Sequence, residues 1–292
     1  MIDTAIIPVA GLGTRMLPIT KEQPKEMLPV PLKSPKYGLI FVPFVHIIFE
    51  NLYDAGIRRF IFIVGRGKRS IENYFTPDWN YLEYLESKGK KREANILRDF
   101  YNKIQDSQLI WVNQPEPQGF GDAVYRGSLL IGNKPFLVHA GDITLVNICG
   151  KAPQYLKILI KAYSEHEFDT LILVRRVEDP RHYGIVLVER QEVKTSYNLY
   201  KVERVIEKPK TPVSNLAIAA VYIFKPVIQK ALEKLETELN SNGEIELTDA
   251  IQYLIDWGYT VYALEVNKCE KLVDIGRPEE YIRSIQLLSN IK

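Results

Sequence analysis

Two glycines and two cations near the start of the chain form a pattern that can bind phosphate. The apolar run Ala5 to Val9 is followed by Gly11-Leu12-Gly13, then by Thr14 and Arg15, and Lys25 comes ten residues later. Glycines let the backbone N–H groups of a tight turn point toward an anion, and successive N–H groups form a partly positive nest. A guanidinium grips two phosphate oxygens, and an ammonium adds a mobile charge. We interpret this stretch as a candidate triphosphate site.

Neither of two common phosphate-binding loops matches this stretch. A Walker loop needs Gly-Lys-Ser/Thr after a glycine and four residues, and that pattern is absent. A dinucleotide fingerprint needs a third glycine three residues after Gly13, where Met16 stands. A Gly-x-Gly pair also occurs in an ordinary strand-to-helix turn, so these residues alone leave both interpretations open.

Polar residues also follow predicted strands farther along the chain. Gln114 follows an apolar run at 108–113, and Asp142 follows one at 135–140. Open α/β sheets bind ligands at the carboxyl ends of their strands, which makes Asp142 a candidate ligand-binding carboxylate. A turn or helix-capping aspartate is the ordinary alternative. For Glu207-Lys208-Pro209, the alternative is an exposed ion pair before a turn proline.

The pattern of apolar residues predicts the elements that must position these side chains. Buried strands are expected at 5–9 and 59–65, and such near-continuous apolar runs are typical of a parallel sheet covered on both faces. Further strands are expected at 108–113, 135–140, 170–175 and 260–266. Helices are expected at 41–55, 70–75, 152–165, 226–238, 248–257 and 278–288, with Thr248 as an N-cap. From Ile185 to Ile206 the period becomes two, which predicts antiparallel strands around a polar tip at 191–198.

Composition excludes several classes of protein. The 292 residues are 46% hydrophobic and 25% charged, as in soluble globular proteins, and the net charge of +2 argues against a nucleic-acid partner. No apolar run is long enough to span a bilayer, and the N-terminus has no signal pattern. Cys149 and Cys269 have no close pairing or metal spacing, so we expect them to be core residues in a reducing compartment. A cytoplasmic enzyme fits these features.

Several separated motifs resemble those of one enzyme family. The segments G-L-G-T-R-M-L-P-I-T-K and P-K-E-M-L-P resemble the nucleotide-binding motif of sugar-1-phosphate nucleotidyltransferases, and the chain looks most like their UTP–glucose-1-phosphate uridylyltransferases. The segments Q-P-E-P-Q-G-F-G-D-A-V, E-K-P, S-N-L-A, G-E-I-E-L-T-D-A-I and V-D-I-G follow in the order of the family. Three positions depart from the family pattern, since Asp122 replaces a histidine and Ala220-Val221 replaces Gly-Arg.

The resemblance implies a fold and a division of the chain. The expected fold is a Rossmann-like, three-layer α/β/α nucleotidyltransferase fold with a mixed, mostly parallel central sheet and a small antiparallel sugar-binding β region. We expect one domain over 1–292, with a nucleotide-binding half at about 1–145, a sugar-binding half at about 146–292 and a helical insertion at about 76–107. No hexapeptide repeat follows the last predicted helix, so no C-terminal β-helix is expected.

The resemblance also implies a reaction. The chain is expected to transfer the uridylyl group of UTP to α-D-glucose 1-phosphate with the help of Mg²⁺, giving UDP-glucose and pyrophosphate. Alternatives are a glucose-1-phosphate thymidylyltransferase and a non-catalytic sugar-nucleotide-binding partner. Glu26 in K-E-M-L-P favours uridine, because thymidylyltransferases usually carry glutamine there. Family members are commonly dimers or tetramers, so a homo-oligomer is expected.

The expected residue roles follow from the matched motifs. Arg15, Lys25 and Lys208 would neutralise phosphates, and Asp142 and Asp274 would hold the metal. The nucleotide would be bound by Ala10, Gly11, Gly13, Thr14, Glu26, Gln114 and Gly119. The sugar would be bound by Gly184, Glu207, Lys208 and Ala220.

Overall fold

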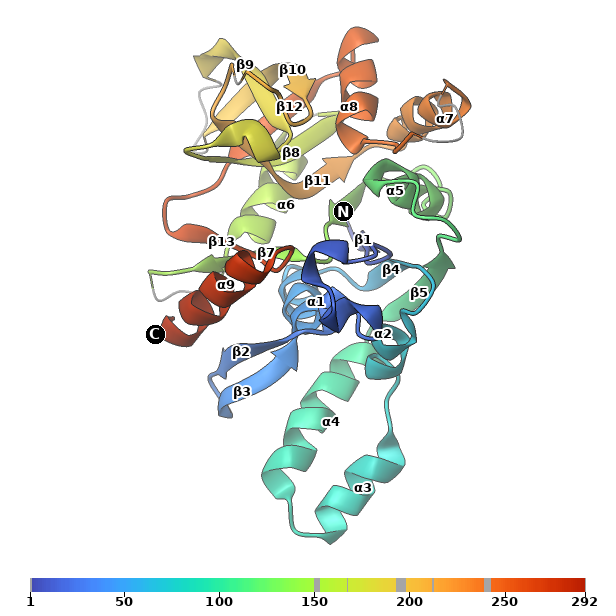
Figure 1. Cartoon of the computed structure of the whole chain (residues 1–292), viewed down its shortest axis with the longest axis vertical. Coiled ribbons are helices and arrows are strands. Elements are labelled where there is room, and N and C mark those ends of the chain that lie inside the picture. Colours follow the sequence, from blue (N-terminus) through green and yellow to red (C-terminus); the bar gives the residue numbers. More distant parts are fainter. Residues whose placement is uncertain are drawn as a thin grey trace.

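A single mixed sheet organises the described part of the computed structural model, which covers residues 2–149, 153–166, 168–192, 198–211, 213–238 and 243–291. Its nine strands are ordered β5-β4-β1-β6-β11-β8-β12-β10-β9 (Figure 1). They are β1 (Thr4–Pro8), β4 (Arg59–Val64), β5 (Gln108–Asn113), β6 (Phe136–His139), β8 (Thr170–Arg176), β9 (Ile185–Glu192), β10 (Leu199–Ile206), β11 (Leu216–Phe224) and β12 (Val261–Glu265).

The sheet combines a parallel part with an antiparallel part. Strands β5, β4, β1 and β6 are parallel neighbours, and β8 pairs in parallel with β12. Strand β11 runs antiparallel between β6 and β8, and the β9–β10 hairpin continues the same sheet beyond β12. The expected α/β class with a mixed sheet is confirmed. The tip predicted at 191–198 lies largely outside the described residues.

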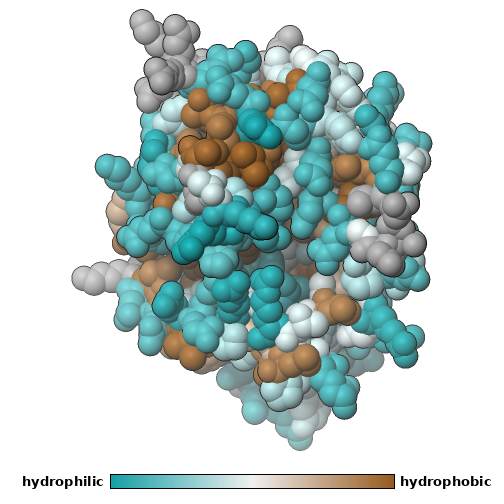
Figure 2. All heavy atoms as spheres, turned by 45° about the horizontal axis from the view of Figure 1, so that its top comes forward, coloured by the Kyte–Doolittle hydropathy of each residue, from teal (hydrophilic) through white to brown (hydrophobic). Residues whose placement is uncertain are grey.

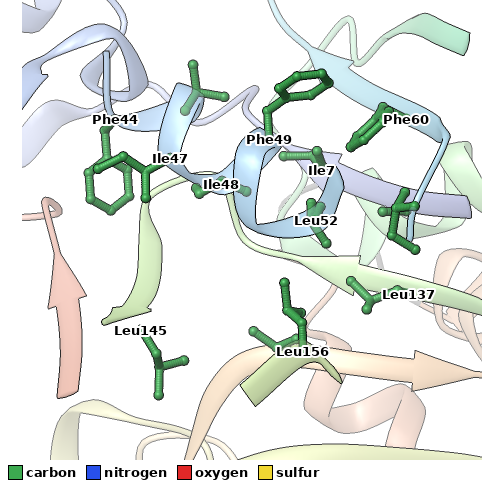
Figure 3. Close-up of a cluster of buried hydrophobic side chains, with 14 of the residues drawn as sticks. Ile7, Phe44, Ile47, Ile48, Phe49, Leu52, Phe60, Leu137, Leu145 and Leu156 are labelled. Carbon is green, nitrogen blue, oxygen red and sulfur yellow. The ribbon is translucent and has the colours of Figure 1, made fainter. Parts of the chain in front are cut away.

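Helices cover both faces of this sheet, because adjacent residues of a strand point to opposite sides. Ile7 packs with Phe49 and Leu52 of α1 in one core cluster, as Figure 3 shows, whereas Ile6 belongs to a second cluster. The helices are α1 (Phe44–Asp54), α2 (Arg69–Tyr74), α5 (Phe120–Ser128), α6 (Tyr155–Glu165), α7 (Ile228–Glu238), α8 (Leu247–Asp256) and α9 (Pro278–Asn290). Helices α5, α7 and α8 contribute to the second cluster. Two helical layers therefore enclose the sheet.

A pair of helices extends away from the sheet, below the other elements in Figure 1. They are α3 (Trp79–Ser87) and α4 (Lys91–Gln105), and they lie between α2 and β5 in the chain. Their apolar faces pack together through Leu82, Leu85 and Ala94, which are buried. The segment at about 76–107, where a helical insertion was expected, thus contains two helices.

Two smaller strand pairs were not predicted from the sequence. β2 (Pro29–Ser34) pairs with β3 (Gly38–Pro43), and β7 (Ile143–Asn147) pairs with β13 (Glu270–Asp274). The helix predicted from Phe41 begins only at Phe44, because residues 38–43 are hydrogen-bonded to β2. The pairing of β7 with β13 joins segments that are more than a hundred residues apart.

The expectation that the two cysteines are unpaired is wrong. Cys149 and Cys269 form a disulfide with a Cα–Cα distance of 5.6 Å. The antiparallel register places Asn147 opposite Glu270, and this brings the two cysteines together at the end of the β7–β13 ladder. The cysteines are 120 residues apart in the sequence, so their spacing gave no sign of the pairing.

The surface is predominantly polar on the face that Figure 2 displays, where hydrophilic side chains separate several apolar patches. Among the described residues, no helix has the length and apolar character needed to cross a membrane. This agrees with the absence of a long apolar run in the sequence.

Candidate active site

Residues that the sequence placed in the site gather at the carboxyl edge of the parallel strands. Ala10 and Gly11 follow β1, Gln114 follows β5, and Asp142 comes three residues after the end of β6. Parallel neighbours end at the same edge of a sheet, where open α/β folds bind ligands. Lys25 reaches this edge from the loop after β1 and bonds to Asp142.

Three adjoining hollows at this edge contain every residue that the sequence placed in the site. A first hollow of about 330 Å³ is lined by Ala10, Gly11, Gly13, Thr14, Lys25, Glu26, Gln114 and Gly119, among others. A second hollow of about 490 Å³ is lined by Arg15, Lys25, Asp142, Lys208 and Asp274, among others. A third hollow of about 230 Å³ is lined by Gly184, Glu207 and Ala220, among others. Phe120 and Asp142 line all three hollows, which makes them one continuous site.

An ion pair lies at the centre of the site. Lys25 Nζ is 2.5 Å from Asp142 Oδ2. Burial lowers the pKa of Lys25, but the charges of Asp142 and Glu26 outweigh it and raise the pKa to about 12. Burial raises the pKa of Asp142, but the charge of Lys25 and its hydrogen bond have a larger, opposite effect. The pKa of Asp142 therefore lies below its ordinary value. Both groups are therefore charged near neutral pH.

Asp274 supplies a second carboxylate beside this pair. The β7–β13 ladder places it opposite Ile143, next to Asp142, and its Oδ1 accepts a hydrogen bond from Gly276 N at 2.6 Å. Burial and the charge of Asp142 raise the pKa of Asp274 to about 7. The two aspartates therefore repel each other. No group of three or more His, Cys, Asp or Glu side chains suited to a metal occurs in the described part of the chain.

A buried ion pair that the sequence did not reveal supports Glu26. Lys68 Nζ is 2.9 Å from Glu26 Oε2, and both side chains are almost fully excluded from solvent. Burial raises the pKa of Glu26, and the charge of Lys68 opposes this increase. The two residues are 42 positions apart, and Lys68 follows a strand without belonging to any recognised motif.

The start of α5 packs against a distant loop. Gly119 has φ of +105°, and a Cβ there would lie 2.7 Å from Ile245 O. Gly121 N donates a hydrogen bond to the same oxygen, so this N–H is not free for a ligand. The close approach of residue 245 therefore requires glycine here independently of any ligand.

The third hollow is bordered by a network of charges. Lys208 Nζ lies 2.8 Å from Glu207 Oε1 and 3.5 Å from Glu246 Oε1. Thr248 donates a hydrogen bond to Glu207 Oε2 at 3.2 Å. Thr248 is not the N-cap that the sequence predicted, because Glu246 occupies that position without a side-chain cap. The hydroxyl orients a carboxylate of the site instead.

Backbone strain in the described residues is concentrated in this region. Lys208 and Ala220 have φ of +39° and +53°, a conformation that residues with a Cβ adopt rarely. Such residues often occur at ligand-binding sites, where the surrounding structure holds them. At Gly184, a Cβ would lie 2.9 Å from both Glu207 Oε2 and Thr248 Cγ2, so a larger residue would displace these side chains.

The geometry favours the binding of a polyanion. Arg15, Lys25 and Lys208 bring three positive side chains to one cavity, and Asp142 and Asp274 bring two carboxylates. Sequence reasoning missed Phe120, Glu246 and Arg277, which also line the site. Arg277 follows the V-D-I-G motif directly and could have been found from that position.

The fold and this site define an α/β protein that gathers cations and carboxylates at the carboxyl edge of its sheet. A protein-family model described as nucleotidyl transferase matches residues 4–290. The chain therefore belongs to the nucleotidyl transferase family.

Relatives of known name and structure agree with this assignment. A protein of Staphylococcus saprophyticus named UTP–glucose-1-phosphate uridylyltransferase 1 is 38% identical over 256 residues, which cover 87% of this chain and 82% of that protein. A UTP-bound UGPase of Acinetobacter baumannii superposes with a TM-score of 0.81 at 30% identity, covering 98% of this chain and 93% of the other. A UDP-glucose pyrophosphorylase complexed with UDP-glucose gives 0.80 at 30% identity, with both chains fully covered.

Proposed function

We propose that this chain transfers the uridylyl group of UTP to α-D-glucose 1-phosphate, forming UDP-glucose and pyrophosphate. The observation that carries the proposal is the single cavity lined by Arg15, Lys25, Asp142, Lys208 and Asp274. Relatives named UTP–glucose-1-phosphate uridylyltransferase that align with most of the chain support the choice of substrates.

The proposed reaction is an in-line displacement between two anions. An oxygen of the sugar phosphate forms a bond to the α-phosphorus of UTP, and the bond from that phosphorus to the bridging β-oxygen breaks to release pyrophosphate. A phosphate monoester has a second pKa of about 6, so the nucleophile is already ionised near neutral pH and needs no general base. The main barrier is repulsion between the anions, and catalysis consists of positioning and neutralisation.

The three cations have separate roles in this proposal. Arg15 binds the triphosphate and the departing pyrophosphate. Lys25, held by Asp142, neutralises the phosphates near the reacting phosphorus. Lys208, held by Glu207 and Glu246, neutralises the incoming sugar phosphate.

The donor set fits a Mg²⁺ ion. Asp142 and Asp274 are neighbouring carboxylates, and the raised pKa of Asp274, about 7, reflects burial and a repulsion from Asp142 that a dication would relieve. Mg²⁺ typically takes one or two carboxylates and completes its shell with waters and substrate phosphates. When bound, the ion would supply positive charge to the phosphate oxygens.

The remaining residues frame the two substrates. Ala10, Gly11, Gly13, Thr14, Gln114 and Gly119 would enclose the nucleotide, with Glu26 near the base and contacting it through water. Gly184, Glu207 and Ala220 would enclose the sugar. Glu26 favours uridine over thymidine by the resemblance of its motif.

A pyrophosphate-release assay with glucose 1-phosphate tests the proposal. We expect turnover with UTP and Mg²⁺, and loss of turnover when the metal is chelated. A rate with dTTP at least about tenfold above that with UTP, equivalent to about 1.4 kcal/mol, would identify a thymidylyltransferase instead. Nucleotide binding without turnover would identify a non-catalytic binding protein.

A matched pair of variants tests the role of Asp142. We expect Asp142→Ala to abolish turnover while the far-UV circular dichroism stays native. Asp256→Ala removes an exposed carboxylate at the end of α8 and serves as the control, with activity unchanged. Undiminished Mg²⁺-dependent turnover in Asp142→Ala would show that Asp142 does not hold the metal.

The proposal extends to location, domain organisation and assembly. UTP and sugar phosphates are intracellular metabolites, so we place the enzyme in the cytoplasm, and a disulfide in such a setting has precedent among hyperthermophiles.

The chain forms one domain with a nucleotide-binding half at about 1–145, a sugar-binding half at about 146–292 and a helical insertion at about 76–107. It assembles as a dimer or tetramer, which light scattering tests, and Phe41, 68% exposed on β3, is a candidate contact.

A further inference from the structure

The side-chain amide of Gln114 is held in one orientation by two acceptors. Its Nε2 donates to Gly119 O at 3.1 Å and to Asp122 Oδ2 at 2.6 Å. A carbonyl oxygen cannot donate a hydrogen bond, and Asp122 is paired with Arg126 as a carboxylate. Because both neighbours are acceptors, the nitrogen end of the amide must face them. The orientation follows from the chemistry of the neighbours.

This orientation leaves only one polar atom of Gln114 available to a ligand. An amide NH₂ has two hydrogens, and both are used by Gly119 and Asp122. The carbonyl oxygen Oε1 has no hydrogen-bond partner within the described residues. Gln114 lines the first hollow, so the group that it offers there is an acceptor.

Asp122 is itself fixed by its surroundings. Its side chain is completely buried, and the same oxygen that binds Gln114 also accepts from Arg126 Nε at 2.9 Å. Arg126 lies one helical turn after Asp122 on α5. Its ion pair therefore holds the Asp122 carboxylate in place against Gln114 Nε2. In the family that the sequence resembles, this position is usually histidine, which can also donate a hydrogen bond. The aspartate can only accept.

We propose that Asp122 is a positioning residue that sets the preference of this site for uracil over cytosine. The inference rests on the proposed nucleotide-binding role of the first hollow. Uracil carries a hydrogen on N3, which Gln114 Oε1 accepts, whereas cytosine presents a lone pair there that faces Oε1 unfavourably. When the wrong ligand leaves a buried polar group of the site without a hydrogen-bond partner, the site discriminates strongly against that ligand.

The test compares kcat/KM for UTP and CTP in the wild type and in Asp122→Ala. Without the aspartate only Gly119 O still holds the nitrogen end of the amide, so its orientation is less strongly fixed and we expect the UTP-to-CTP ratio to fall by at least about tenfold. The fall comes mainly from a higher KM for UTP, and the KM for glucose 1-phosphate stays unchanged. An unchanged ratio, or equal losses with both nucleotides, would overturn the proposal and leave Asp122 as a structural partner of Arg126.

Two further measurements separate positioning from folding. Asp122→Asn keeps an acceptor oxygen for Gln114 Nε2 and Arg126 Nε, because its amide nitrogen can take the position of Oδ1, which has no hydrogen-bond partner in the described part of the chain. This conservative variant should therefore retain the UTP-to-CTP ratio that Asp122→Ala loses, and a lowered ratio in it would contradict the proposal. In a Gln114→Ala background, Asp122→Ala should leave the ratio unchanged, because Asp122 acts through the amide. A fall in the ratio of the same size in both backgrounds would contradict the proposal.

Calorimetry keeps this inference distinct from the proposed reaction. Binding of UTP and CTP to the wild type and to Asp122→Ala needs no turnover, so it tests base selectivity even if the transferase assay fails. A preference for dTTP over UTP would overturn the proposed substrate but not this inference, since thymine also carries a hydrogen on N3. Equal affinity of the wild type for UTP and CTP would refute it.

Discussion

At the scale of single residues, buried charges fix the groups that face the ligand. Glu26 is 1% exposed and would be costly to ionise alone, and Lys68 compensates its charge at 2.9 Å. Asp122 acts similarly on Gln114, through a hydrogen bond instead of a charge. Glu26 and Gln114 thus each depend on a buried partner side chain.

Removing Lys68 alone should destabilise the fold. Lys68→Met leaves Glu26 buried without its cation, and we expect the free energy of unfolding in urea to fall by about 3–5 kcal/mol. The double variant Lys68→Met/Glu26→Gln removes both charges and should recover most of this loss. A cost below about 1 kcal/mol for Lys68→Met would show that the pair contributes little.

Buried histidine should make stability fall at acid pH. Burial and the nearby charge of Lys103 lower the pKa of His46 to about 3, while the unfolded value is about 6.5. Between these values only the unfolded chain binds the proton, so this residue reduces the free energy of unfolding by up to about 1.4 kcal/mol per pH unit as pH falls. Urea titrations of the wild type and His46→Gln should diverge between pH 6 and 4 with this slope, and parallel curves would contradict the assignment.

At the scale of elements, one strand pair connects the metal carboxylates of the proposal. Asp142 precedes β7 and Asp274 ends β13, so the antiparallel ladder brings them side by side. The disulfide between Cys149 and Cys269 closes the opposite end of the same ladder. Loss of this pairing would therefore separate two carboxylates of the site.

Breaking the disulfide should lower stability. Cys149→Ser removes a link across 120 residues of sequence, and we expect the free energy of unfolding to fall by about 2–4 kcal/mol. Cys269→Ser should cost the same, and the double variant no more than either. Quantification of thiols in the denatured, unreduced wild type provides the direct check, and two free thiols there would exclude the bond.

At the scale of the whole molecule, the two proposed halves share one continuous sheet. Strand β11 from the second half lies between β6 and β8, and its backbone bonds to both. Residues of β1 contribute to both core clusters, Ile7 to one and Ile6 to the other. The halves are therefore expected to fold together.

Unfolding should follow a single transition. Trp79, Trp111 and Trp257 lie on α3, on β5 and after α8, so tryptophan fluorescence samples distant parts of the chain. We expect the denaturation curve from fluorescence to coincide with that from far-UV circular dichroism. Two separate transitions, assigned with Trp111→Phe and Trp257→Phe, would mean that the halves are independent domains.

The sequence by itself determined the parallel strands and the charged residues of the site. Apolar runs of the right length predict strands 59–65 and 108–113, and burial on both faces explains the first of them. Short motifs mark Arg15, Lys25 and Glu207-Lys208 because their chemistry is local. The structure brings Arg15, Lys25 and Lys208 around one cavity and Glu207 to the adjoining one.

Only the tertiary structure decided which distant groups meet. The Cys149–Cys269 bond, the Lys68–Glu26 pair and the β7–β13 ladder join residues that are 42 or more positions apart. Periodicity reports the surroundings of each residue along its own element, whereas these contacts depend on the order of strands in the sheet. That order is set by packing of the whole chain, which no local pattern encodes.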